Sequence, residues 1–237
     1  MMNIAENLRK VREEIAAACA RSGRSPEEVT LIAVSKTKPV SMIEEAIQAG
    51  AVDFGENKPQ ELRDKVDVLG NDHLRWHLIG HLQRNKVKYV ISRACMIHSV
   101  DSLRLGEAIS QEAVKHGLVM PVLVEVNIAG EDTKFGASPE DAPALVEQLA
   151  ALPGLSVRGL MTIAPYVENA CDNRVHFRNL RDLSIDIASK NIDNVTMCEL
   201  SMGMTGDYTV AVEEGATLVR VGTGIFGERN YQIGDNT

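Results

Sequence analysis

The sequence predicts an α/β protein: a (β/α)8 barrel of the TIM type with an extra helix at its N-terminal end. Eight short apolar runs alternate with longer amphipathic stretches along the 237 residues. Such alternation is typical of parallel strands joined by right-handed crossovers, and eight units in this length favour a closed barrel over an open sheet. No linker or low-complexity segment interrupts the pattern, so we expect residues 1–237 to form a single domain.

The first expected element is a helix that precedes all the strands. Asn3 is suited to be its N-cap, with Glu6 three residues later, and the helix should end near Ser22 and Gly23. Apolar residues recur between these ends at helical spacing: Ile4, Leu8, Val11, Ile15 and Ala18. Only fifteen residues follow Gly222, too few for a full eighth helix and a tail. We therefore expect the first helix to fill that gap in the outer ring.

The strands and the other helices follow from the alternating pattern. The predicted strands are residues 31–36, 52–57, 76–80, 96–100, 122–128, 157–163, 197–201 and 218–222. The predicted helices between them include residues 41–49, 102–116, 139–151, 172–189 and 207–214. The helix at 139–151 is expected to begin with Pro139, Glu140 and Asp141, because proline and acidic residues suit a first helical turn.

Composition and charge argue against several classes of protein. The formal net charge is −8 with acids and bases scattered, and a chain without a basic stripe binds nucleic acid poorly. The cysteines lie far apart, and His77 and His81 straddle Gly80 at a strand end, so we expect no metal site. The chain shows neither a bilayer-length apolar run nor the apolar core of a signal peptide. We expect a cytoplasmic protein that does not bind membranes, and a monomer because no interface is marked.

In a barrel of this kind the reactive groups lie at the C-terminal ends of the strands. The first predicted strand ends on Lys36 and the second on Glu56 and Asn57. The segments after the seventh and eighth strands, residues 201–207 and 220–224, are rich in glycine and hydroxyl groups. These positions are therefore the first candidates for chemistry.

The two late segments have the composition of a phosphate-binding cradle. Glycine lets the backbone approach an anion, and hydroxyl and main-chain N–H groups donate hydrogen bonds to it. The residues that carry this prediction are Ser201, Gly203, Thr205, Gly222, Thr223 and Gly224. Either segment alone is better explained as a turn. Both together, at the ends of strands seven and eight, favour a phosphate site.

Lys36 is the candidate reactive residue, although most lysines at strand ends are simply solvated. A lysine beside an apolar surface loses some of its ammonium form, which makes a neutral, nucleophilic amine accessible. Such an amine condenses with an aldehyde to a Schiff base. A phosphorylated aldehyde would use both the lysine and the cradle, and pyridoxal 5'-phosphate is such a compound. Lys38 either adds positive charge beside Lys36 or, as we favour, is a surface lysine.

Arg220 lies within the apolar run V-R-V and needs a partner there. One interpretation is an ion pair with Glu199 on the neighbouring strand. The other is a contact with the pyridine nitrogen of the cofactor. An arginine there donates a hydrogen bond but does not make the ring a pyridinium, so the ring would be a weak electron sink.

Six motifs in order carry a resemblance that spans the chain from Ile4 to Arg229. They are A-V-S-K-T-K-P (33–39), F-G-E-N (54–57), W-H-L-I-G-H-L-Q (76–83), R-G-L-M (158–161), L-S-M-G-M-T-G-D (200–207) and V-R-V-G-T-G-I-F-G-E-R (219–229). This set resembles the pyridoxal phosphate homeostasis proteins, single-domain relatives of the alanine racemase barrel. Two departures, Leu78 where the family often has phenylalanine and Phe135 in a usually polar stretch, affect local packing only.

The resemblance implies cofactor contacts and no catalytic residue. By that likeness the cofactor-binding residues are Lys36 as the Schiff-base lysine, Ser201, Gly222 and Thr223 at the phosphate, Arg220 at the pyridine nitrogen and Asn57 near the ring. It also implies a non-catalytic protein of intracellular pyridoxal phosphate homeostasis, which holds the cofactor and passes it to apo enzymes.

The alternative is a pyridoxal-phosphate-dependent amino-acid racemase with a single barrel domain. Racemisation requires proton transfer on both faces of the α-carbon, and therefore a second base besides the lysine. Tyr166 and Tyr208 are the tyrosines expected near the mouth of the barrel. A Schiff-base aldolase acting on a sugar phosphate agrees with the barrel but not with the six motifs. We favour the carrier.

Overall fold

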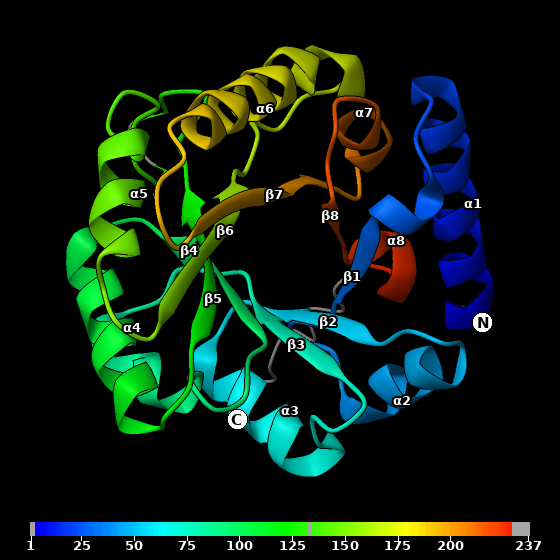
Figure 1. The fold of residues 1–237 in the computed structure, drawn as a ribbon. Coiled ribbons are helices and arrows are strands. Elements are labelled where there is room, and N and C mark those ends of the chain that lie inside the picture. The colour runs from blue at the N-terminus through cyan, green and yellow to red at the C-terminus, as the bar shows by residue number, and fades with distance from the viewer. Residues whose placement is uncertain (1–2, 132–133, 229–237) are drawn as a thin grey trace, which may run out of the picture.

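The structure, a computed structural model, describes residues 3–131 and 134–228. Eight parallel strands pair in chain order, and β1 also pairs with β8, so the sheet closes into a barrel (Figure 1). The strands are β1 (Thr30–Val34), β2 (Asp53–Glu56), β3 (Arg75–Leu78), β4 (Met96–Val100), β5 (Met120–Glu125), β6 (Leu155–Met161), β7 (Val195–Met204) and β8 (Leu218–Val221). All eight predicted strands are confirmed, with ends shifted by a few residues.

Helices form an outer ring around the barrel (Figure 1). They are α1 (Ile4–Ser22), α2 (Val40–Gln48), α3 (Pro59–Leu69), α4 (Leu103–Lys115), α5 (Ala142–Ala150), α6 (Arg174–Ser189), α7 (Tyr208–Glu213) and α8 (Thr223–Phe226). Short 3-10 helices occupy Pro26–Glu28, Arg84–Tyr89 and Ala170–Asn173. The five predicted inter-strand helices are present, and α3 is an addition to them. Among the described residues, no helix has both the length and the apolar character needed to cross a bilayer.

The expected role of the N-terminal helix is confirmed. The Asn3 side chain accepts a hydrogen bond from the backbone N–H of Glu6 at 3.0 Å, and Gly23 ends the helix with a left-handed φ of 69°. Helix α8 has four residues, and α1 packs against it and against α2 and α7 (Figure 1). Asn7 Nδ2 also donates to the carbonyl of Ile225 at 2.9 Å. The first helix therefore closes the ring that the short last helix leaves open.

The predicted start of the helix at 139–151 is wrong. Helix α5 begins at Ala142, and residues 139–141 form a turn before it. The Ser138 hydroxyl accepts the N–H of Asp141 at 3.1 Å, as an N-cap does, and donates to the Asp141 carboxylate at 2.8 Å. The helix begins later because Pro143, in the first turn of α5, has no N–H to donate to the carbonyl of Pro139.

The expectation of a loop at 201–207 is also wrong in part. Strand β7 extends beyond the predicted end at Ser201 to Met204, so Gly203 is a strand residue. Gly203 has φ of 89°, and a Cβ at that position would lie 2.6 Å from the Cβ of Ala211 in α7. The glycine is therefore needed for close packing of α7 on the strand rather than for a turn. The end of the sixth motif, Arg229, lies outside the described residues.

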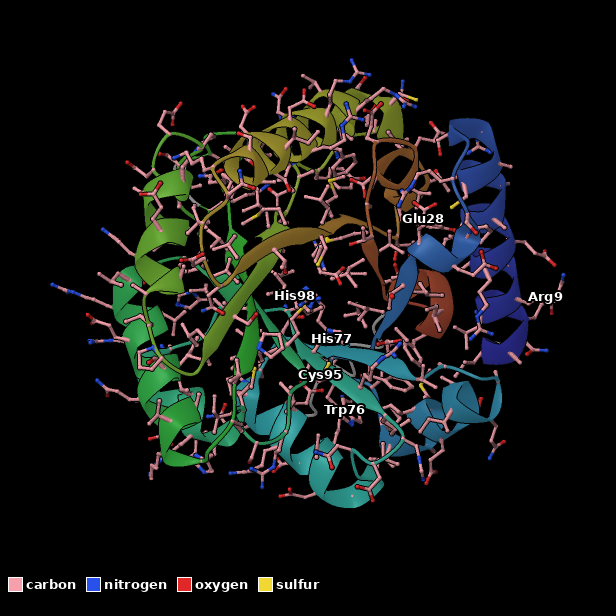
Figure 2. All side chains as sticks on the ribbon, viewed as in Figure 1. Arg9, Glu28, Trp76, His77, Cys95 and His98 are labelled. Carbon is pink, nitrogen blue, oxygen red and sulfur yellow. The ribbon has the colours of Figure 1, made fainter. Side chains whose placement is uncertain are left out.

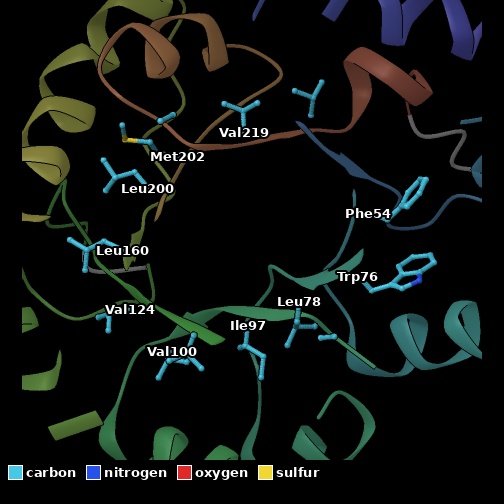
Figure 3. Close-up of a cluster of buried hydrophobic side chains, with 14 of the residues drawn as sticks. Phe54, Trp76, Leu78, Ile97, Val100, Val124, Leu160, Leu200, Met202 and Val219 are labelled. Atoms are coloured by element: carbon cyan, nitrogen blue, oxygen red, sulfur yellow. The ribbon is translucent and has the colours of Figure 1, made fainter. Parts of the chain in front are cut away.

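Apolar side chains fill two regions, one on each side of the strands. The larger region lies between the barrel and its helices, where Phe54 and Trp76 pack with ring centroids 5.3 Å apart (Figure 3). The smaller region contains Ile32, Leu123, Met161 and Leu218. These four residues come from β1, β5, β6 and β8 and contact one another across the barrel, so they fill its interior.

The packing of α1 predicts the effect of Leu8→Ala. Leu8 is buried on the face that contacts the barrel, so removing its side chain should lower the free energy of unfolding by about 2–5 kcal/mol. Urea denaturation measures this loss. The neighbouring Arg9→Ala removes only an exposed ion pair with Glu13 and should cost about 0.5 kcal/mol or less. Equal losses for the two variants would mean that α1 is not part of the barrel's packing.

Candidate functional site

A cavity of about 270 Å³ lies at the C-terminal ends of β1, β2, β7 and β8. Five of the six residues expected to bind a cofactor line it: Lys36, Asn57, Arg220, Gly222 and Thr223. The rest of the lining consists of Val34, Ile79, Ile163, Met204, Thr205 and Gly206. Ser201 does not line this cavity. The rule that active groups collect at the C-terminal ends of barrel strands thus brings together residues up to 187 positions apart in the sequence.

Thr205 connects the two glycine-containing segments at the cavity. Its hydroxyl oxygen accepts the backbone N–H of Gly222 at 3.3 Å and of Gly224 at 3.4 Å. A Cβ on Gly224 would lie 3.2 Å from the methyl carbon of Thr205, so the close approach favours glycine. The segments after β7 and β8 therefore form one surface, as expected for a cradle. The sequence predicted Thr205 as part of the cradle, although the resemblance did not include it among the cofactor contacts.

Lys36 lies in a tight turn directly after β1 rather than at the strand's end. The backbone N–H of Ser35 still bonds to the carbonyl of Gly55 at 3.1 Å, and the N–H of Lys38 closes the turn on Ser35 at 3.0 Å. Thr37 has a left-handed φ of 63°, which is uncommon for a residue with a branched Cβ. The turn is thus held in a conformation that needs support from its surroundings.

That support comes from the buried Glu56 and Lys65 together with the half-buried Glu61, which we call the buried ion cluster. The ammonium of Lys65 donates to Glu56, Glu61 and the carbonyl of Ser35, each at 2.7 Å. Glu56 also accepts the hydroxyl of Ser35 at 2.6 Å, and Glu61 accepts the N–H of Thr37 at 2.6 Å. Burial raises the pKa of Glu56 despite the nearby Lys65 ammonium. The cluster therefore holds Ser35 and Thr37, the residues on either side of Lys36, by hydrogen bonds.

Lys38 has a role that neither of its two sequence interpretations described. Its ammonium donates to the carbonyls of Phe226, Gly227 and Glu228, each at 3.0 Å. Those carbonyls end α8 and begin the segment after it. Lys38 therefore ties the turn after β1 to the segment after the last strand.

Arg220 is buried in the barrel interior and bonds to its neighbours there. Its guanidinium donates to the hydroxyl of Ser201 at 2.5 Å and to the carbonyl of Thr162 at 2.7 Å. The alternative of an ion pair with Glu199 is not supported, because Glu199 accepts the hydroxyl of Thr217 at 2.7 Å. Burial lowers the pKa of Arg220 to about 10, so it is still a cation at neutral pH.

Ser201 belongs to a line of polar side chains below Arg220, which we call the interior column: Asp53, His77, His98, Ser201 and Arg220. His98 Nδ1 lies 2.9 Å from Ser201 Oγ, and His98 Nε2 lies 3.0 Å from His77 Nδ1. His77 Nε2 in turn lies 3.1 Å from Asp53 Oδ1. Both histidines lie near the centre of the barrel (Figure 2). The Ser201 hydroxyl is therefore engaged inside the barrel, which explains why it does not reach the cavity.

The charges around this column affect each other strongly. Desolvation lowers the pKa of His77, but hydrogen bonds to Asp53 and Cys95 outweigh it and raise the value to about 9. Burial, together with the charges of His77 and Arg220, lowers the pKa of His98. Burial also raises the pKa of Glu125 to about 7. At neutral pH we therefore expect a charged His77 and a neutral His98.

A second hollow of about 350 Å³ adjoins the first and shares three wall residues with it: Ile163, Met204 and Gly206. Its lining includes Tyr166, whose side chain is exposed. Tyr208 points elsewhere, because its hydroxyl donates to Glu14 of α1. Within residues 3–131 and 134–228 no group of histidine, cysteine and acidic side chains is arranged to hold a metal ion.

The buried ion cluster predicts a large effect of Lys65→Met. Loss of the ammonium leaves the Glu56 carboxylate buried without its partner, which should cost about 3–5 kcal/mol of unfolding free energy. Adding Glu56→Gln should recover part of the loss, because no buried charge then stands alone. Denaturant titration measures all three proteins.

A surface ion pair provides the control for that comparison. Lys190→Met breaks the exposed pair with Glu147 and should cost less than about 1 kcal/mol. If Lys65→Met is no more costly than Lys190→Met, the cluster does not stabilise the turn that carries Lys36.

Comparisons with known proteins place this geometry in a family. The family described as "Alanine racemase, N-terminal domain" matches residues 3–230. The Pyridoxal phosphate homeostasis protein of Aquifex aeolicus is 46% identical, over 97% of this chain and 100% of its own length. The protein of the same name from Escherichia coli is 41% identical, over 98% of this chain and 99% of its own length.

Solved structures agree with these matches. PipY of Synechococcus elongatus, in a structure described as having PLP bound, is 36% identical with a TM-score of 0.82, covering 94% of this chain and 100% of PipY. An alanine racemase of Clostridium difficile, 14% identical with a TM-score of 0.75, shares the fold over 97% of this chain and 58% of its own. The chain therefore belongs to the family of pyridoxal phosphate homeostasis proteins, built on the barrel of the alanine racemase N-terminal domain.

Proposed function

We propose that this chain is a pyridoxal 5'-phosphate-binding protein of intracellular cofactor homeostasis, which holds the cofactor as a Schiff base on Lys36 and catalyses no reaction on it. One observation carries the proposal. A single cavity collects a lysine, a buried arginine and two hydroxyl- and glycine-containing segments: Lys36, Arg220, and the segments around Thr205 and Thr223. The name and the bound ligand of similar proteins support the same cofactor.

The residues at the cavity fit this group. A phosphate needs donors, and Thr223 supplies a hydroxyl beside the backbone of Gly222. A pyridine nitrogen needs a hydrogen-bond donor, and the Arg220 guanidinium is one. Asn57, which lines the cavity, has a buried side-chain oxygen that finds no hydrogen-bond partner among the described residues. An unsatisfied polar atom of this kind is costly unless a ligand satisfies it.

Each residue then has a defined role. Lys36 would hold the cofactor through its amine, and the cofactor would supply the aldehyde that such an amine binds. Gly222 and Thr223 bind the phosphate, Asn57 lies beside the ring, and Arg220 faces the pyridine nitrogen. Thr205 adds a further hydroxyl to the cavity lining, whereas Ser201 does not line the cavity. Its own contribution is indirect, because it fixes the guanidinium of Arg220 from below.

The carrier is a better proposal than the racemase for two reasons. An arginine at the pyridine nitrogen makes the ring a weak electron sink, which disfavours carbanion chemistry. A racemase also needs a second positioned base. Of the two tyrosines expected near the mouth, Tyr208 is bonded to Glu14 and Tyr166 is 96% exposed. The proposal extends to a monomeric, cytoplasmic single-domain protein, residues 1–237, that passes its cofactor to apo enzymes.

Replacing the proposed Schiff-base lysine tests the central role. Lys36→Ala should abolish the visible absorption band that appears on adding pyridoxal 5'-phosphate, because no amine remains in the cavity to condense with the aldehyde. Borohydride reduction followed by peptide mapping should place the adduct on Lys36 in the unaltered chain. Lys36→Arg keeps a positive charge but cannot condense, and it should also lack the band. A retained band in either variant would move the reactive amine elsewhere, with Lys38 examined next.

The proposed phosphate contact predicts a graded loss. Thr223→Val removes one hydroxyl donor and leaves the backbone donors in place. The dissociation constant for pyridoxal 5'-phosphate should therefore rise about fivefold to twelvefold, which corresponds to the loss of one neutral hydrogen bond of about 1–1.5 kcal/mol. Titration monitored by absorbance measures the constant. Thr196→Val, the same change at an exposed position of β7, is the control and should leave it unaltered. An unchanged constant for Thr223→Val would remove this residue from the site.

A further inference from the structure

The interior column is a continuous series of contacts through the barrel, and its two ends lie in different environments. Its lower end is Asp53 at the start of β2, which also accepts two hydrogen bonds from Arg75 at 2.6 and 2.5 Å. The Arg75 side chain is 59% exposed at the start of β3. The upper end of the column is Arg220, which lines the cavity. The column therefore joins solvent at the base of the barrel to the candidate site at its mouth.

The two ends give the column a direction. Arg220 can only donate hydrogen bonds, and an ionised Asp53 can only accept them. When both histidines are neutral, one arrangement satisfies every link. Ser201 accepts from Arg220 and donates its hydroxyl to His98 Nδ1, and His98 Nε2–H donates to His77 Nδ1. His77 Nε2–H then donates to Asp53.

A proton on His77 reverses the middle of the column. Charged His77 donates from both nitrogens, so its Nδ1–H points to His98 Nε2. His98 must then carry its own proton on Nδ1 and donate it to Ser201 Oγ. Ser201 thus accepts from His98 and from Arg220 together. One proton at His77 therefore changes the tautomer of His98 and the orientation of the Ser201 hydroxyl, because each group has only one remaining option.

We propose that the interior column is a buried relay that positions Arg220 and couples its hydrogen bond to the protonation of His77 at the base of the barrel. This inference rests on the proposed function only where Arg220 contacts the cofactor. His98 and Ser201 act in it as positioning residues, since neither lines the cavity.

The groups that face the two ends decide the direction of the effect. His77 faces Asp53 of β2, Cys95 before β4 and His98 of β4, with Arg75 of its own strand bonded to Asp53. Arg220 faces Glu125 of β5 and Asp207 before α7, besides Ser201 of β7 and the backbone of Thr162. Glu125, whose pKa is about 7, is already ionised over the pH range in which His77 loses its proton near 9. The protonation state of His77 is therefore the change that the interior column passes on to Arg220.

Loss of the His77 proton should strengthen the hydrogen bond that Arg220 donates to Ser201. A hydroxyl that donates onward is a better acceptor, because hydrogen bonds in a chain polarise one another. The pKa of His77 is about 9 in the folded chain against about 6.5 for an unperturbed histidine. The stability that this proton contributes is therefore complete below about pH 6.5 and is lost as the pH rises through 9.

Nitrogen NMR of the histidine-labelled, cofactor-free chain tests the relay itself. We expect His77 to titrate with a midpoint near pH 9 and His98 to change tautomer, from Nδ1–H to Nε2–H, with the same midpoint. His77→Gln should abolish the tautomer change of His98, because the side chain that faces His98 Nε2 then no longer titrates. A single His98 tautomer from pH 6 to 10 would overturn the relay, and this test does not require the proposed function.

The cofactor provides the second readout. In the unaltered chain, the absorbance of added pyridoxal 5'-phosphate should show a pH-dependent component with a midpoint near 9, and His77→Gln should remove it. Ser201→Ala should raise the dissociation constant severalfold, because Arg220 loses an acceptor. Leu123→Met, elsewhere in the interior, is the control and should change neither. Identical pH profiles for the unaltered chain and His77→Gln would overturn the coupling. Failure of every protein to bind the cofactor would instead overturn the proposed function, and the NMR result would still stand.

Discussion

The bond from Arg220 to Ser201 is the contact on which the architecture of the site depends. A guanidinium placed inside a closed barrel is costly unless its donors find acceptors there. Arg220 takes one acceptor from β7 and one from the backbone after β6, at Thr162. Ser201 must therefore remain in the strand, and its other hydrogen bond must go to an interior residue, His98. One buried charge thereby accounts for the positions of Ser201 and His98 inside the barrel.

Two buried networks, rather than the surface loops, set the cationic groups of the cavity. The ion cluster around Lys65 holds the backbone on both sides of Lys36, and the interior column holds Arg220. The two networks come from different parts of the barrel wall, and all their side chains except Glu61 are buried. A site whose charged groups are held in place before binding loses less entropy when a ligand arrives, which suits the retention of a small cofactor.

The sequence predicted those features that depend on local pattern. Periodicity identified the strands, a capping residue identified the start of α1, and position at strand ends identified Lys36, Gly222 and Thr223. The end of β7 was placed too early because S-M-G-M-T-G has the composition of a turn, whereas Gly203 permits the close packing of α7 on the strand. Lys65 was missed because a lysine four residues after an acid on a helix normally faces water. Only the folded chain shows that Lys65 is buried.

An open cavity mouth favours a carrier over an enzyme on physical grounds. Ile163 and Met204 line both hollows at the mouth, and each is more than a third exposed. Water that reaches a Schiff base can hydrolyse it, which returns the free aldehyde and the lysine. Controlled proton transfer on a substrate requires the opposite condition, a closed site from which water is excluded. Within the described residues, buried networks beneath the site and an exposed rim above it agree with the proposed holding and release of a reactive aldehyde.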